Sequence, residues 1–146
     1  MDAAQQHAWE RVNTIDLLGR AYSRLGFMIV DGVVGAGFPQ KPRHSAVFAQ
    51  IRPEGSRLSE LAQGANMTPQ SMGEIVDELE ELGYVERRPD PTDRRAKLVT
   101  LTALGRKCIA AGEETIRGLE SEIDERIGER SHAELRQMLE RLVAED

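Results

Sequence analysis

The fold is decided by residues 68–102, which read TPQSMGEIVDELEELGYVERRPDPTDRRAKLVTLT. The first part predicts a helix over residues 68–83, because Thr68 is a good N-cap, Pro69 suits the first helical position and Gly83 supplies a left-handed stop. Apolar residues recur along it at helical spacing: Met72, Ile75, Val76, Leu79 and Leu82. The pattern therefore predicts a helix that buries one face and exposes a polar one.

A β-hairpin is predicted directly after this helix. Residues 84–88 read as one short strand, and residues 98–102, which are rich in β-branched side chains, read as the other. Between them, residues 89–96 (PDPTDRRA) combine turn-forming and charged residues, so we expect a protruding loop there.

Helices are expected on both sides of this stretch. Apolar spacing predicts a first helix over residues 4–34, and shorter helices over 44–51 and 58–65. A long helix over 103–128 follows the hairpin, and Ser131 with Glu134 forms a capping box that opens a last helix. The fold class is mainly α with a small β-hairpin.

Two short helices followed by a hairpin predict a winged helix-turn-helix, with the helix over 68–83 as the recognition helix. Such a helix enters the major groove by its N-terminus, which brings Thr68, Gln70 and Ser71 toward DNA. An arginine at the hairpin tip can enter a narrow minor groove. Asp93, two residues before Arg95, is placed to brace this wing.

The net charge of −6 at first argues against a polyanionic partner, but the charge is segregated. Residues 84–107 hold seven basic and three acidic side chains, whereas residues 108–146 hold five basic and eleven acidic ones. This segregation suggests that one region meets a polyanion.

Composition excludes several other classes of protein. The single cysteine allows neither an intrachain disulfide nor a cysteine-cluster zinc site, and no apolar run approaches the length of a membrane span. The first ten residues do not resemble a signal peptide, so a cytoplasmic protein without membrane contact is expected. No catalytic, cofactor-binding or metal-binding motif is found, so we expect neither an enzyme nor a cofactor.

Three motifs resemble the MarR-type multidrug and stress-response transcriptional regulators. They are LxxLGYVxR at residues 79–87, PDPxDRRA at 89–96 and VxLTxxG at 99–105. The resemblance covers roughly residues 58–106. It implies a homodimer, built by dimerisation helices in residues 1–38 and 103–146, around a winged helix-turn-helix in 43–102 with its wing at 84–102. It also implies a repressor of a pseudo-palindromic operator in double-stranded DNA, released by a small aromatic or phenolic effector.

The resemblance also implies roles for single residues. Gln70 and Ser71 fall on the turn that contacts bases and phosphates, Arg95 on the minor-groove arginine and Asp93 on the wing-bracing acid. Arg94 and Lys97 fall at flanking wing positions that meet the DNA backbone.

The chain departs from the family pattern at position 74. Many relatives have a basic or polar DNA-contacting residue there, and this chain has Glu74, which can accept a hydrogen bond from cytosine but repels phosphates. Glu74 and the net negative charge favour an alternative, a winged-helix protein–protein interaction module or a regulator that has lost specific DNA binding.

The remaining reactive residue types have simpler interpretations. Cys108, inside a helix, is expected to be a small buried apolar residue rather than a redox switch. The three histidines, at positions 7, 44 and 132, lack the spacing of a metal site. The sequence does not decide whether four residues line a ligand cavity or belong to the core. They are Tyr22, Met28, His44 and Phe48.

Overall fold

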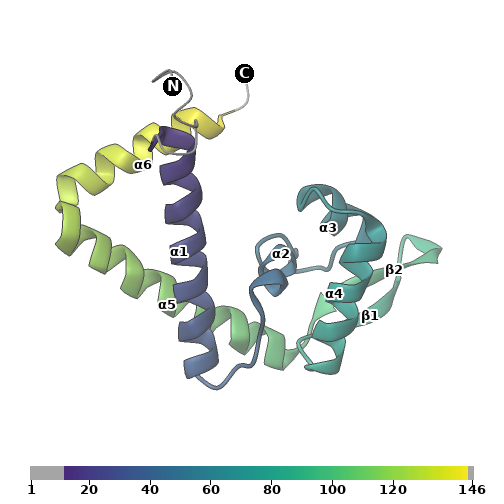
Figure 1. The fold of residues 1–146 in the computed structure, drawn as a ribbon. Coiled ribbons are helices and arrows are strands. Elements are labelled where there is room, and N and C mark those ends of the chain that lie inside the picture. The colour runs from purple at the N-terminus through teal and green to yellow at the C-terminus, as the bar shows by residue number, and fades with distance from the viewer. Residues whose placement is uncertain (1–11, 145–146) are drawn as a thin grey trace, which may run out of the picture.

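The computed structural model describes residues 12–144, and residues 1–11 and 145–146 lie outside the described range. Three long helices form one part of the molecule, here called the helical arm (Figure 1). In this arm α1 (Thr14–Gly35) packs against α5 (Ala103–Ile127), and α6 (Glu129–Val143) turns back from the end of α5. The expected dimerisation segments 1–38 and 103–146 are therefore described only from residue 12 and up to residue 144.

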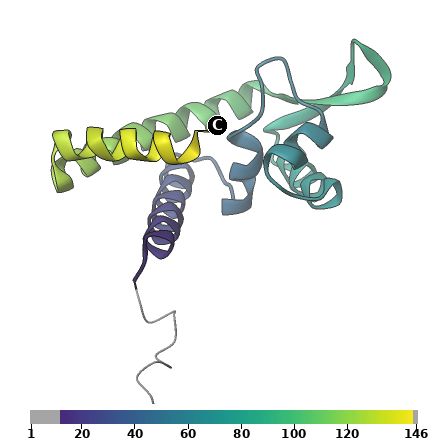
Figure 2. The same cartoon turned by 90° about the horizontal axis from the view of Figure 1, so that it is seen from above.

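The second part, here called the winged unit, lies between α1 and α5 in the chain. It contains, in order, the 3₁₀ turn η3 (Pro42–His44), α2 (Ser45–Phe48), α3 (Leu58–Gly64), α4 (Pro69–Glu81), β1 (Val85–Asp90) and β2 (Asp93–Leu101). The strands pair antiparallel with Val85 opposite Leu101, and Ser56 adds a single bridge to Val99. Figure 2 shows the tip of the hairpin projecting beyond the helices.

The core of the winged unit is built around the apolar face of α4. Side chains from this face meet those of α2, α3 and both strands, and the fully or almost fully buried members are Val47, Leu61, Met72, Ile75, Val76, Leu79, Val85 and Val99. Burying side chains of this size contributes about 1.5–3 kcal/mol each, so the core fixes the orientation of α4.

Tyr84 connects this core to the rest of the chain. Its ring lies 6.0 Å from the ring of Phe48, and its hydroxyl donates to the carbonyl oxygen of Pro39 at 2.7 Å. The same buried cluster includes Val33 of α1 and Cys108 of α5. The helical arm and the winged unit therefore share one continuous core.

The VxLTxxG motif has a clear structural reason. Thr102 caps α5 by accepting from the backbone N–H of Gly105 at 3.0 Å, and its hydroxyl donates to the carbonyl oxygen of Gly83 at 2.5 Å. A Cβ atom at position 105 would lie 2.0 Å from the carbonyl oxygen of Tyr84, so only glycine fits there. Gly83 itself has φ = +80°, as expected for a left-handed helix stop.

Some element boundaries differ from the sequence prediction. The first helix was expected to begin at residue 4, and residues 4–11 lie outside the described range. The described helix begins at Thr14, because Asn13 is its N-cap and accepts from the backbone N–H of Asp16. The helix expected over residues 44–51 is shorter and begins earlier, as η3 and α2 over residues 42–48.

The hairpin and the last helix also differ from the sequence prediction. The loop expected over residues 89–96 is mostly strand, because backbone pairing continues to Asp90 and resumes at Asp93, with a register shift after Pro89. The last helix begins at Glu129 rather than at the Ser131 box, because Gly128 with φ = +87° already turns the chain.

Candidate nucleic-acid interface

The start of α4 presents polar side chains to solvent. Gln70, Ser71 and Glu74 are exposed on the face opposite the core. Thr68 is occupied as the cap: its hydroxyl oxygen accepts from the backbone N–H of Ser71 at 3.2 Å, and the hydroxyl donates to Ser71 Oγ at 3.0 Å. Gln70 and Glu74 therefore retain the most hydrogen-bonding capacity at this end of the helix.

The wing carries an uncompensated cluster of cations. Arg94, Arg95 and Lys97 are exposed on β2, and none of the three forms an ion pair with any residue between positions 12 and 144. The strand that bears them pairs with β1, which packs against α4, and the hairpin extends past α4 (Figure 1). The positive charge of this segment is therefore available to a polyanion.

Asp90 and Arg57 anchor the base of the hairpin tip. The Arg57 guanidinium donates to Asp90 Oδ2 from Nε at 2.9 Å and from Nη2 at 2.7 Å. The other carboxylate oxygen accepts from the backbone N–H and the hydroxyl of Thr92, both at 2.8 Å. These bonds from Thr92, together with Arg57, hold the pKa of Asp90 below its ordinary value.

Asp93, the residue expected to brace the wing, makes fewer contacts than Asp90. Its Oδ1 accepts from the backbone N–H of Arg95 at 3.0 Å, and its Oδ2 lies 3.9 Å from Arg57 Nη2. Sequence reasoning gave no role to Arg57 or Asp90, although Asp90 belongs to the PDPxDRRA motif. Their sequence separation of 33 residues leaves no periodic signal that joins them.

The negative charge of α4 is largely neutralised by cations from other elements. Glu78 accepts from Lys41 Nζ at 3.0 Å, from Arg43 Nε at 3.0 Å and from His44 Nε2 at 2.8 Å. Hydrogen bonds from Arg43, His44 and Lys41 hold the pKa of the Glu78 carboxyl well below its usual range. Sequence reasoning did not find this cluster, because its members are more than thirty residues apart.

Arg87 of β1 neutralises the other side of the helix. Its Nη2 lies 2.8 Å from Asp77 Oδ1, and its Nη1 pairs with Glu80. The acidic residues that argued against DNA in the sequence thus mostly face protein cations rather than the exposed start of α4.

The two described histidines are buried and hydrogen-bonded, and His7 lies outside the described range. His44 is 1% exposed; its Nδ1 accepts from the backbone N–H of Lys41 at 3.1 Å, so its Nε2 carries the proton that it donates to Glu78. His132 has Nδ1 2.7 Å from Asp124 Oδ1 and joins α6 to α5. Residues 12–144 contain no group of three or more potential metal ligands.

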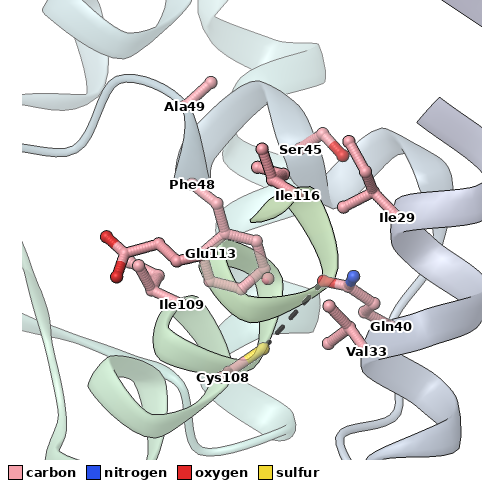
Figure 3. A pocket seen from close by; sticks show the side chains of 11 residues that line it. Ile29, Val33, Gln40, Ser45, Phe48, Ala49, Cys108, Ile109, Glu113 and Ile116 are labelled. Atoms are coloured by element: carbon pink, nitrogen blue, oxygen red, sulfur yellow. Dashed lines mark hydrogen bonds between the residues drawn. The ribbon is translucent and has the colours of Figure 1, made fainter. Parts of the chain in front are cut away.

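A cavity of about 310 Å³ lies between α1, α2 and α5. Figure 3 shows its wall, which is mostly apolar and includes Ile29, Val33, Phe48, Ile109 and Ile116. Its polar members are few, namely Gln40, Ser45 and Glu113. The cavity is large enough for a small aromatic molecule.

Cys108 also lines this cavity, with its Sγ 4.0 Å from Gln40 Oε1. Burial raises the pKa of the Cys108 thiol to about 11, so the thiol is protonated near neutral pH. Of the four residues named as cavity or core, only Phe48 borders this space. His44 is bound to Glu78, while Tyr22 and Met28 border other hollows along α1.

The helical arm leaves apolar side chains in solvent. On α1, Ile15 and Tyr22 are 78% and 82% exposed, and on α6, Leu142 and Val143 are 68% and 77% exposed. Such faces are typical of a surface that another chain covers. No helix in residues 12–144 is both long and apolar enough to cross a membrane.

Known proteins resemble this chain both in sequence and in structure. A family model described as the MarR family matches residues 41–96, from the segment before η3 into the wing. The HTH-type transcriptional repressor Rv2887 of Mycobacterium tuberculosis is 33% identical over 88 residues, which are 60% of this chain and 63% of that repressor. The match thus spans less than two thirds of that relative's length.

Two solved structures extend the likeness over the helical arm. The Rv2887 protein of Mycobacterium tuberculosis in complex with salicylic acid is 25% identical, with a TM-score of 0.68 over 92% of this chain and 98% of that one. CouR from Rhodococcus jostii, bound to p-coumaroyl-CoA, is 26% identical, with a TM-score of 0.67 over 87% of this chain and 89% of that one.

Proposed function

We propose that the chain is a member of the MarR family and acts as a homodimeric transcriptional repressor that binds a pseudo-palindromic operator. The observation that carries the proposal is the pairing of charges around α4. Within residues 12–144, the wing cations Arg94, Arg95 and Lys97 form no ion pair. Three of the five acids of α4, namely Asp77, Glu78 and Glu80, are instead bound by Lys41, Arg43, His44 and Arg87. We propose no enzymatic reaction for it, and we place its action in the cytoplasm.

In the proposed complex, α4 enters the major groove by its N-terminal turn. Gln70, Ser71 and Glu74 then face base edges or phosphates, with Thr68 at the helix cap. Arg95 enters the adjacent minor groove, where Arg94 and Lys97 meet the DNA backbone. The Arg57–Asp90 pair, with Asp93, keeps the hairpin tip in the shape that this contact needs.

We propose that a two-fold dimer forms through the apolar faces of α1 and α6. In such a dimer the two recognition helices contact half-sites about 34 Å apart, which is one turn of B-DNA. The dimer would also cover Ile15, Tyr22 and Leu142, whose exposure an isolated chain does not explain.

We propose that the effector binds the cavity between α1, α2 and α5. A mostly apolar wall favours a small aromatic ligand, and the Rv2887 and CouR structures hold salicylic acid and p-coumaroyl-CoA. Ser45 lines the cavity and directly follows His44, which binds Glu78 of the recognition helix. A ligand that shifts α2 would therefore move α4 and weaken DNA binding.

The test is selection of bound fragments from random DNA duplexes, followed by binding assays on the selected site at several salt concentrations. The expected result is an inverted repeat bound by a dimer, with affinity that falls steeply as salt rises. Salicylic acid is then added to the complex, and it should release the DNA. Failure to retain any DNA at low salt would instead support the protein–protein interaction module.

A further inference from the structure

Glu74 occupies the centre of the exposed face of α4. It lies four residues after Gln70, so the two side chains project from the same side of the helix, one turn apart. The opposite side, with Met72, Val76 and Leu79, is completely buried, so the helix cannot rotate about its own axis. A helix that enters the groove with Gln70 in contact therefore also brings Glu74 to the DNA.

The Glu74 carboxylate forms no ion pair with residues 12–144, unlike most of its acidic neighbours. Within residues 12–144, Asp77, Glu78 and Glu80 are all ion-paired, whereas Glu74 and Glu81 have neither an ion pair nor a side-chain hydrogen bond. An ionised carboxylate is only an acceptor, so both of its oxygens remain free for donors.

A nearby cation lowers the cost of placing this carboxylate near DNA. Arg43 is bound to Glu78 and lies close enough to Glu74 to interact with it electrostatically. The Arg43 guanidinium is exposed on this side of α4, so it offsets part of the repulsion between Glu74 and phosphates.

An unpaired carboxylate discriminates among bases by what each base offers in the major groove. Guanine presents only acceptors there, and thymine presents an acceptor and a methyl group. Adenine has a donor beside the N7 acceptor, which repels a carboxylate, whereas the amino group of cytosine has a C–H group and no acceptor beside it on its own ring. We propose that Glu74 is a specificity-determining residue that selects a cytosine in each half-site by accepting from its exocyclic amino group. This inference rests on the proposed function of α4 as a recognition helix.

The test compares the DNA sites selected by four proteins from one random library: the wild type, Glu74→Ala, Glu74→Gln and the control Glu81→Gln. Glu81 is exposed and unpaired like Glu74, but it lies at the end of α4 farthest from the N-terminal turn. The wild type and the control should select an inverted repeat with one symmetric cytosine. Glu74→Ala should keep the rest of the site and lose the preference at that position by on the order of tenfold or more.

Glu74→Gln should shift the preference from cytosine toward adenine, because an amide matches the donor and acceptor of adenine. A duplex in which the selected cytosine is replaced by an analogue without the amino group should weaken binding of the wild type and leave Glu74→Ala unaffected. Thermal unfolding of each variant confirms that the exposed substitutions leave the fold intact.

The outcomes separate this inference from the proposed function. If all four proteins select the same site, or if both Glu74 variants bind every sequence more tightly without a change of preference, then Glu74 only repels phosphates and the inference is wrong. In either case, the proposed function stands. If the wild type selects no site and binds no DNA at low salt, the inference and the proposed function both fail.

Discussion

Replacement of Arg95 by alanine should weaken operator binding without weakening the fold. The Arg95 side chain is exposed and makes no ion pair or hydrogen bond with residues 12–144, so its loss should change the free energy of unfolding by less than about 0.5 kcal/mol. The bond from its backbone N–H to Asp93 survives the substitution. One lost groove contact is expected to cost about 1–3 kcal/mol, and a two-fold dimer loses two of them, about 2–6 kcal/mol per operator.

The assay is fluorescence anisotropy with the selected operator at fixed salt, in which Arg95→Ala should raise Kd at least about thirtyfold. Arg117→Ala is the matched control, because it removes the same charge from an exposed position in the second half of α5. An unchanged Kd for Arg95→Ala would remove the wing from the mechanism. Equal losses for both variants would show that only the net charge matters.

Three further results concern the fold that supports this interface. Leu79→Ala should lower the free energy of unfolding by about 2–5 kcal/mol, since Leu79 is completely buried; an unchanged urea midpoint would contradict its place in the core. Because the pKa values of Glu78 and Asp90 are lowered in the folded state, the unfolded chain takes up more protons in acid. As the pH is lowered below about 4, the urea midpoint of unfolding should therefore decrease, and it should decrease less steeply with pH in Glu78→Gln than in the wild type. Equal dependence on pH in the two proteins would contradict the pairing of Glu78. Cys108 should react with a thiol reagent at pH 8 much more slowly in the native protein than in denaturant; equal rates would show that it is not buried.

Local signals in the sequence predicted the parts of the interface that depend on local physics. The structure confirms the predicted ends of α4. The helix begins at the Thr68 cap and the proline after it, and it ends just before the left-handed Gly83. The apolar spacing likewise identified the buried face of this helix, because a helix of fixed period places Met72 and Leu79 on the same side.

The hairpin shows where local signals mislead. Pro89 and the charged residues after it are typical of a loop, yet β1 and β2 continue through most of this stretch. Strand pairing uses backbone groups, so an exposed hairpin does not need alternating apolar side chains to persist. The arginines therefore lie on an ordered strand rather than in a flexible loop.

Charge compensation depends on tertiary contacts, so the sequence alone could not predict it. Glu78 and Arg87 read as two ordinary surface charges, but Glu78 is bound by the segment before α2 and Arg87 binds two acids of α4. The net charge of −6 therefore misrepresents the surface that α4 and the wing present. In the proposed complex, this compensation removes most of the repulsion that α4 of an acidic chain would otherwise exert on DNA.

The most direct test of the account is a hydroxyl-radical footprint of the wild-type protein on its selected operator. The account predicts two protected segments related by the dyad of the site, with centres about one helical turn apart, each flanked by minor-groove protection. The flanking protection should disappear with Arg95→Ala while the central protection persists. A single protected segment, or flanking protection that Arg95→Ala leaves unchanged, would contradict the arrangement of recognition helix and wing described above.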